Sequence, residues 1–418
     1  MGYQDYLQPL CNSAKSASRK LAILDAPIKN NILLTVADLL VKFEKDILQE
    51  NLKDLENARE QKLDAAKIER LTLNRKRIEE MADGLKEVAA LPDPVGEVLH
   101  LKKRPNGMRV GQMTVPIGVI AIIYESRPNV TIDSASLCLK SGNSVILKGG
   151  SEAIHSNQKL AELFVEALKM FNVPEGAVTF INKTDRGVTA ELLKMDGEID
   201  LVIPRGGEGL IQAVTEGSRI PVIKHDKGLC HIYVDSDANL EMALKIALNA
   251  KVQRPGTCNA METLLIHAKA APLLLPDLLD KLNQRGVEIR GCPETQKYGE
   301  FVKPAAESDY RTEYLDLILS IKVVASLEEA MVHIEQYGSR HTESIITENY
   351  SQGVKFLNEI DASAVMINAS TRLNDGYQFG LGAEIGISTS RIHARGPMGL
   401  RELTSKKFVV FGNGQIRE

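Results

Sequence analysis

Cys258 is the residue whose position in the sequence best suits covalent chemistry. It lies in the stretch 253–262, which contains the pair Pro255-Gly256. A Pro-Gly pair predicts a turn, and the apolar run at 263–266 that follows predicts a buried strand. Because the thiolate is the nucleophilic form of cysteine, this loop could bring the Cys258 sulfur to a substrate. Most free cysteines are instead small buried apolar residues, so the loop alone leaves both interpretations open.

Two glycine-rich segments that follow predicted strands have the chemistry of a phosphate site. Each places a cation and at least two glycines after a short apolar run, and the first adds a serine at the expected N-cap of the next helix. Backbone amides at a helix N-terminus suit a phosphate, although Gly-Gly before a helix is often ordinary turn chemistry. Neither segment is a GxGxxG motif. Two such ends in one sheet favour a bound nucleotide, and the candidate residues are Lys148, Gly150, Ser151, Pro204, Arg205, Gly206 and Gly207.

Composition excludes several classes of function. The 418 residues are 44% hydrophobic and 25% charged, as in a soluble globular protein of two to three domains. A net charge of −4 argues against non-specific binding to nucleic acid or to an anionic membrane. No apolar run approaches the roughly 18 residues of a membrane span, and the N-terminus has no secretion signal. We therefore expect neither a nucleic-acid partner nor a membrane.

The cysteines indicate a reducing compartment. There are five of them, an odd number, and none forms a CxxC pair. This pattern fits neither a disulfide framework nor a zinc site, so we expect reduced thiols, no metal and a cytoplasmic protein.

The first 117 residues predict helices and then a hairpin. In residues 3–90 the apolar positions Leu71, Ile78, Met81, Leu85 and Val88 form one stripe on a solvated helix. An Asn-Gly turn at 106–107 between two alternating runs is a strong hairpin signal. An isolated hairpin is only marginally stable, so it must pair with its own chain or with a partner subunit. The strand expected at 408–411 could supply that pairing.

From residue 118 short β-branched runs alternate with helical segments. The runs at 119–123, 145–147, 178–181, 201–203 and 222–223 form one series, and a second series runs from 232 to 367. This alternation predicts two doubly wound α/β domains with parallel sheets and a small β oligomerisation element. The expected domains are 1–94 with 118–226 for cofactor binding, 227–400 for catalysis, and 95–117 with 401–418 for oligomerisation.

Four longer motifs carry a resemblance to a known family. They are residues 124–131 (YESRPNVT), 253–260 (QRPGTCNA), 337–345 (YGSRHTESI) and 387–400, which contains SRIHARGPMG. With the glycine segments, they make the chain similar to the aldehyde dehydrogenase superfamily over nearly its whole length. More narrowly the chain resembles the members that reduce L-glutamyl 5-phosphate in proline biosynthesis. These motifs are long and dispersed, so a chance match is improbable.

The resemblance implies roles for individual residues. Cys258 would be the nucleophile, and Asn129 would stabilise the oxyanion together with the Cys258 backbone amide. Lys148 would hold the adenosine ribose, and Glu313 would lie by the nicotinamide ribose. For Asn129 the alternative is that it only caps the helix after Pro128.

Two departures from the superfamily pattern are informative. Where hydrolytic members carry a general-base glutamate, this chain has Lys224, which cannot activate water for thioester hydrolysis. Where members that prefer NAD often have a glutamate, it has Ser151, which tolerates a 2′-phosphate and favours NADPH. Glu152, one residue further on, is the counterargument.

The expected reaction is therefore an NADPH-dependent reduction through a Cys258 thioester. It would convert L-glutamyl 5-phosphate to L-glutamate 5-semialdehyde and phosphate. The substrate carries a phosphate and an α-carboxylate, so its site needs cations, and Arg254 is the candidate for the phosphate. The resemblance also implies a homo-oligomer, and we expect a transient contact with glutamate 5-kinase, which makes the substrate. The candidate substrate-binding residues are Arg127, Arg254, His341, Arg391 and Arg395.

Three alternatives are open from the sequence. A related enzyme could use a CoA ester or oxidise an aldehyde to an acid. A cysteine hydrolase could use His225 or His341 as its base, but the glycine segments would then have no purpose. A non-catalytic nucleotide-binding protein could retain the fold, although it would not need Cys258 on a loop.

Overall fold

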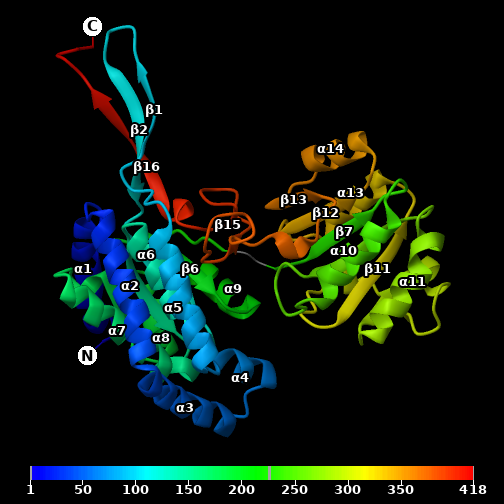
Figure 1. Ribbon diagram of the computed structural model, residues 1–418, viewed down its shortest axis with the longest axis horizontal. Coiled ribbons are helices and arrows are strands. Elements are labelled where there is room, and N and C mark those ends of the chain that lie inside the picture. Colours follow the sequence, from blue (N-terminus) through cyan, green and yellow to red (C-terminus); the bar gives the residue numbers. More distant parts are fainter. Residues whose placement is uncertain (1, 225–226, 418) are drawn as a thin grey trace. The chain divides into compact units, whose positions relative to one another are not determined.

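The computed structural model describes residues 2–224 and 227–417, and the chain divides into two compact units (Figure 1). Unit 1 comprises Met1–Lys224, Gly380–Gly386 and Met398–Glu418, and unit 2 comprises His225–Phe379 and Ile387–Pro397. Each unit has its own parallel sheet and its own apolar core. The predicted α/β class with two parallel sheets is therefore confirmed. None of the helices in the described part of the chain is long and apolar enough to span a bilayer.

Helices form the start of unit 1, but the predicted apolar stripe is split between two of them. All five stripe residues are buried. Leu71 ends α4, however, whereas the other four lie on α5. The Asn51 side chain binds Leu71 O and Leu73 N in the break, and Asn74 caps α5 by accepting from Arg77 N. The helices are α1 (Tyr3–Leu21), α2 (Ala26–Lys42), α3 (Glu44–Glu60), α4 (Ala65–Leu71) and α5 (Arg75–Ala90).

The sheet of unit 1 has the strand order β5-β4-β3-β6, and its pairs are parallel. The strand predicted at 222–223 is wrong, because only a single bridge joins Val222 to Val202. Pro221 just before it has no N–H to extend the pairing. The strands are β3 (Val119–Tyr124), β4 (Ser144–Gly149), β5 (Val178–Phe180) and β6 (Leu201–Arg205). The helices among and after them are α6 (Asn129–Lys140), α7 (Ile154–Met170), α8 (Arg186–Leu192) and α9 (Glu208–Gly217).

The predicted hairpin is confirmed, and so is its pairing with the tail strand. It consists of β1 (Val98–Lys103) and β2 (Arg109–Pro116), and β16 (Thr404–Phe411) pairs along the whole of β2. The turn contains Gly107 at φ 91°, a conformation that favours glycine. The three strands extend from the helices of unit 1 as a ribbon (Figure 1).

Unit 2 has a larger sheet with the order β10-β9-β11-β8-β7-β12-β13. Both faces are buried: Leu264 and Ile266 pack with α10 and α11, whereas Leu265 packs with α13 and α14. The strands are β7 (Cys230–Val234), β8 (Met261–His267), β9 (Glu288–Gly291), β10 (Lys303–Pro304), β11 (Ile318–Val324), β12 (Thr342–Ile346) and β13 (Ala364–Ile367). The helices are α10 (Leu240–Val252), α11 (Ala271–Gln284), α12 (Pro293–Gln296), α13 (Leu327–Tyr337) and α14 (Tyr350–Glu359), and a short pair β14 (Ile387–Ser388) and β15 (Gly396–Pro397) follows.

The compact units differ from the expected domains near residue 390. Residues 380–386 and 398–400, expected in the catalytic domain, cluster with unit 1. Gly386 lies against the Arg205 side chain, and Ile385 N donates to Met398 O, so these segments pack on unit 1. The division into three functional domains stays a prediction.

Candidate active site

Predicted cofactor residues of unit 1 meet at the carboxyl ends of β3, β4 and β6. The chain runs from β3 outward to β5 and then returns to β6 on the other side of β3, and such a switch point is where ligands bind in these sheets. A pocket of about 510 Å³ opens there, within the size range of small-molecule sites. Lys148, Gly150, Ser151 and Gly207 line it, whereas Pro204, Arg205 and Gly206 are not among its described lining residues.

The segment after β4 presents an ammonium and a hydroxyl to this pocket. Lys148 Nζ donates to Gly149 O at 2.9 Å, and burial lowers the pKa of Lys148. Ser151 is exposed and begins a 3₁₀ turn, whereas Ala153 is the N-cap of α7, so the serine is not the expected cap. Glu152 Oε1 accepts from Ser126 N at 2.6 Å and from Ser126 Oγ at 2.7 Å. Two donors of Ser126 therefore hold one oxygen of the Glu152 carboxylate.

A carboxylate already lies at the amide end of α9. Gly207 N donates to Glu125 Oε2 at 3.0 Å, and a Cβ at Gly206 would lie 2.5 Å from the same oxygen. The absence of a side chain at Gly206 therefore lets an anionic group approach the helix end. A phosphate at this position would have to displace Glu125 or lie beside it.

Asn129 is the first residue of α6, and its side chain does not cap the helix. Its Nδ2 donates to Asp133 Oδ2 at 2.9 Å, one turn further along. Burial raises the pKa of Asp133 to about 6, while Asn129 and the Arg205 charge act against that rise. Asp133 thus orients the Asn129 amide. The Arg205 guanidinium lies against Gly386, and its charge acts on the Asp133 carboxylate.

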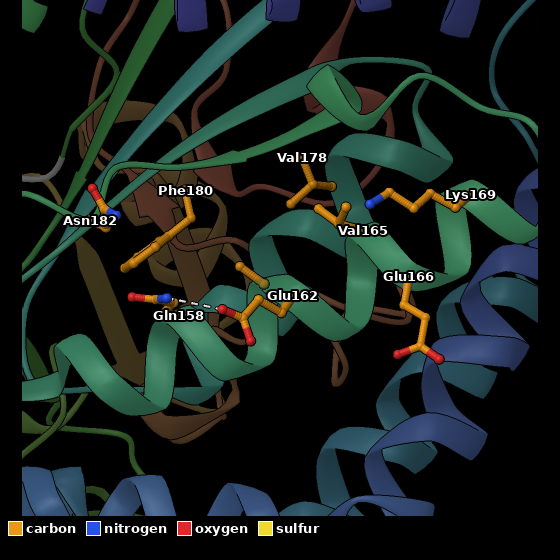
Figure 2. A pocket seen from close by; sticks show the side chains of 9 residues that line it. Gln158, Glu162, Val165, Glu166, Lys169, Val178, Phe180 and Asn182 are labelled. Atoms are coloured by element: carbon orange, nitrogen blue, oxygen red, sulfur yellow. Dashed lines mark hydrogen bonds between the residues drawn. The ribbon is translucent and has the colours of Figure 1, made fainter. Parts of the chain in front are cut away.

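A second pocket of unit 1, of about 520 Å³, lies between α7 and β5 (Figure 2). None of the predicted site residues lines it. Glu162 and Glu166 of α7 line it, and Lys169, which also lines it, pairs with Glu175 at 3.3 Å. This acidic lining is unsuited to the phosphates of a nucleotide, so the pocket after β4 stays the candidate cofactor site.

Cys258 lies between α10 and β8, at the amino ends of the strands of unit 2. It is partly exposed, and all five cysteines are free thiols. The Cys230 Sγ donates to Cys258 O at 3.2 Å. Gly228 packs so closely on the loop that a Cβ there would lie 2.1 Å from Cys258 O, which requires glycine. The nucleophile candidate is therefore held by its backbone while its thiol stays partly accessible.

Two carboxylates hold neighbouring segments against this loop. Glu313 Oε1 accepts from Gly228 N at 2.9 Å, so this predicted cofactor residue lies beside the cysteine loop within unit 2. Glu262 Oε1 accepts from Leu315 N at 3.1 Å, and its Oε2 pairs with Lys251 Nζ at 2.7 Å. Lys251 and Glu262 are fully buried on either side of the loop. Burial lowers the pKa of Lys251 and raises that of Glu262 to about 7.

Four predicted substrate residues lie at the amino ends of the strands in unit 2. His341 is buried, and its Nδ1 lies 3.6 Å from Cys230 Sγ and 2.7 Å from Thr342 Oγ1. Arg254 is exposed on the cysteine loop. Arg391 pairs with Asp361, and Arg395 Nη2 lies 2.6 Å from the same carboxylate. Asp361 therefore already balances part of the charge of these two arginines.

The remaining candidates lie elsewhere or outside the described residues. Arg127 is exposed on the turn before α6 in unit 1. His225, the alternative base of a hydrolase, lies outside the described residues.

Arg372 is a residue of the site that the sequence interpretation missed. It stands on the short helix Thr371–Leu373, and its guanidinium bonds to Asn259 Oδ1 and, at 2.9 Å, to Gln253 Oε1. It therefore spans the cysteine loop from one end to the other. No motif marks it: its contact with Asn259 joins positions 113 residues apart, and the available signal was a lone arginine in a polar turn after a predicted strand.

Comparison with known proteins places this geometry in a family. Residues 4–303 match the model of the aldehyde dehydrogenase family. The chain is 57% identical over 405 residues to a gamma-glutamyl phosphate reductase of Thermodesulfovibrio yellowstonii, and the matched region covers 97% of each chain. It is 55% identical over 413 residues to one of Carboxydothermus hydrogenoformans, which covers 99% of this chain and 100% of the relative.

A solved structure supports the same placement. The crystal structure of gamma-glutamyl phosphate reductase from Thermotoga maritima is 49% identical and has a TM-score of 0.96. The match covers 99% of this chain and 100% of that one. The chain therefore belongs to the aldehyde dehydrogenase family, and within it to the gamma-glutamyl phosphate reductases.

Proposed function

We propose that this enzyme reduces L-glutamyl 5-phosphate to L-glutamate 5-semialdehyde and phosphate, with NADPH as the reductant, in the second step of proline biosynthesis. The Cys258 thiolate attacks the acyl carbon, a C–S bond forms, and phosphate leaves with the electron pair of the broken C–O bond. When bound, NADPH would supply the hydride that reduces the resulting thioester. Collapse of the thiohemiacetal then releases the semialdehyde and restores the thiolate.

The observation that carries this proposal is the cysteine loop. A partly exposed thiol stands on a backbone fixed by Gly228 and Cys230, beside Arg254 and Arg372. A lysine, Lys224, occupies the place of the general-base glutamate of hydrolytic relatives, which suits an enzyme that must protect a thioester from water.

The reverse reaction separates this proposal from its nearest rivals. With L-glutamate 5-semialdehyde and NADP, reduced cofactor should accumulate over many turnovers only when inorganic phosphate is present. Sustained turnover without phosphate would indicate an aldehyde-oxidising enzyme, and turnover supported by CoA in place of phosphate would indicate a CoA-dependent one.

The residues of the pocket after β4 fit a nucleotide cofactor. Lys148 would hold the adenosine ribose, and Ser151 would face the 2′-phosphate. A phosphate near Gly207 would lie beside the Glu125 carboxylate or replace it at the amide end of α9. Glu313 would lie by the nicotinamide ribose. Ser126 N and Oγ both donate to Glu152 Oε1, which holds the Glu152 carboxylate toward the turn before α6.

Ser151→Glu is expected to shift the cofactor preference from NADPH toward NADH. A carboxylate at this exposed position would repel the 2′-phosphate, so KM for NADPH should rise about tenfold while KM for NADH stays nearly constant. Steady-state kinetics with both cofactors measure the ratio. Ser151→Gln, which has a similar size and no charge, is the matched control. An unchanged ratio in Ser151→Glu would remove Ser151 from the 2′-phosphate site.

Asn129→Ala is expected to lower kcat by about 10²- to 10³-fold, because one oxyanion donor is lost. Binding of NADPH should not change, since Asn129 does not line the cofactor pocket. Stopped-flow hydride transfer and fluorescence titration of the cofactor measure the two quantities. Full turnover of Asn129→Ala would refute the oxyanion role.

The protein is also proposed to form a homo-oligomer, and the ribbon formed by β1, β2 and β16 is its proposed interface. The ribbon exposes apolar side chains, among them Phe408 at 72% and Val410 at 58%, and such a surface is typical of an interface. Phe408→Asp is expected to lower the molar mass measured by light scattering toward that of one chain. Ile23→Asp, at a position 85% exposed outside the ribbon, is the control. A monomeric wild-type protein at assay concentration would contradict the proposal.

A transient contact with glutamate 5-kinase in the cytoplasm belongs to the same proposal. The five free thiols support a reducing compartment. Faster coupled turnover with the kinase than with equimolar substrate supplied in bulk would support the contact, and equal rates would contradict it.

A further inference from the structure

The guanidinium of Arg372 is held across the loop that carries Cys258. Its Nε donates to Gln253 Oε1 at 2.9 Å, before the cysteine, and its Nη1 donates to Asn259 Oδ1, directly after it. Asn259 Nδ2 in turn donates to Asn374 O at 3.0 Å, so the segment around Arg372 and the loop hold each other. These hydrogen bonds fix the Arg372 guanidinium against the loop that carries Cys258.

In the part of the chain that the structure describes, both hydrogen-bond acceptors of the Arg372 guanidinium, Gln253 and Asn259, are side-chain amides and carry no charge. The nearby carboxylate of Asp375 is engaged elsewhere, since its Oδ1 accepts from Tyr377 N at 3.0 Å and from Gln378 N at 3.2 Å. Arg372 is half-buried. Its pKa is lowered mainly by burial and also by the charge of Arg254. The charges of Cys258 and Asp375 act against this lowering. The Arg254 and Arg372 charges therefore interact beside the sulfur of Cys258.

An anion that lies between two such like charges relieves their repulsion. A phosphate accepts hydrogen bonds from two guanidinium groups, whose planar forks match its oxygens. Arg391 and Arg395, also in unit 2, differ from this pair because the Asp361 carboxylate lies between them and pairs with both.

We propose that Arg254 and Arg372 form a phosphate site beside Cys258. On the proposed function, on which this inference rests, the site holds the phosphoryl group of the acyl phosphate before attack and the phosphate ion after the C–O bond breaks. In the reverse direction it holds inorganic phosphate for attack on the thioester. The leaving group is bonded to the carbon that Cys258 attacks, whereas the α-carboxylate lies at the far end of the glutamyl chain. The site beside the sulfur therefore belongs to the phosphate.

The experiment is protection of Cys258 from alkylation, measured on the full chain with inorganic phosphate alone. Peptide mass spectrometry follows the rate at which iodoacetamide labels Cys258. Phosphate should slow the labelling of the wild-type protein in a saturable way. Arg372→Gln and Arg254→Gln should each raise the half-protecting phosphate concentration about tenfold or more, because each removes a charged donor. Arg285→Gln, at an exposed position on the end of α11, is the control and should match the wild type.

Arg372 also tethers the loop, so a second variant separates the two roles. Gln253→Leu removes one acceptor of the Arg372 guanidinium while both positive charges remain. It should keep the phosphate protection within about twofold, since the anion loses no donor. If Gln253→Leu lost protection as fully as Arg372→Gln, Arg372 would act only through the loop, and the phosphate site would be overturned. Phosphate protection that is unchanged in Arg372→Gln would overturn it as well.

The same protein preparations distinguish this inference from the proposed function. Protection that depends on both arginines, without any phosphate-dependent reduction of NADP, would leave the anion site standing and remove the proposed reaction. Phosphate-dependent reduction with the same phosphate KM in wild type, Arg254→Gln and Arg372→Gln would keep the reaction and remove the site.

Discussion

Cys258→Ser is expected to lower kcat by about 10⁴-fold or more, because the hydroxyl replaces the group that forms the covalent intermediate. A serine hydroxyl is not ionised near neutral pH, and no general base is placed to activate it in the proposed mechanism. The measurement is NADP reduction with semialdehyde and phosphate. Titration of the cofactor should give the wild-type affinity, since the pocket proposed for the nucleotide lies in unit 1.

Cys292→Ser is the matched control for this result. Cys292 is the other partly exposed cysteine and is the N-cap of α12. Its sulfur lies 3.4 Å from Thr295 Oγ1. Turnover of Cys292→Ser should equal that of the wild type within a factor of about two, as for a site outside the chemistry. If Cys258→Ser turned over at the wild-type rate, the proposed chemistry would be wrong.

Lys251→Met is expected to lower the free energy of unfolding by about 3–5 kcal/mol. Its Nζ lies 2.7 Å from Glu262 Oε2, and both side chains are fully buried. Removal of the ammonium leaves a buried carboxylate without its charged partner, and the pKa of Glu262 is already raised to about 7 with that partner present. Chemical denaturation followed by circular dichroism measures the loss.

Two further variants give this prediction its controls. Lys245 on the same helix pairs with Glu241 at the same distance of 2.7 Å, but both side chains are largely exposed. Lys245→Met should therefore have little measurable effect. Adding Glu262→Gln to Lys251→Met removes the stranded charge, so the double variant should be more stable than Lys251→Met alone. Equal losses from Lys251→Met and Lys245→Met would contradict the account.

Features encoded by local patterns were predictable from the sequence. The Asn-Gly turn marked the hairpin, and the apolar run at 408–411 marked the strand that pairs with it. Lys148, Ser151 and Gly207 line one pocket because they lie at or just after the carboxyl ends of strands of the same parallel sheet. Cys258 was placed correctly on a loop before β8 because Pro-Gly and an apolar run flank it.

Features that depend on contacts between distant segments were not predictable. Arg372 reaches the cysteine loop only because residues 370–374 fold back onto Asn259, and no local motif encodes that contact. The pairing of Arg391 and Arg395 with Asp361 likewise joins positions 30 and 34 residues apart. The helix predicted through Leu71 failed because the side chain of Asn51, far back in the sequence, binds the backbone where the helix ends.

The measurement that tests the central claim most directly is a single-turnover burst without phosphate. Enzyme mixed with L-glutamate 5-semialdehyde and NADP should form about one NADPH per active site and then stop, because the thioester has no acceptor. Mass spectrometry should find a glutamyl adduct on the peptide that contains Cys258, and added phosphate should remove it and start steady turnover. Continued NADPH formation without phosphate, or a burst that leaves Cys258 unmodified, would contradict the account.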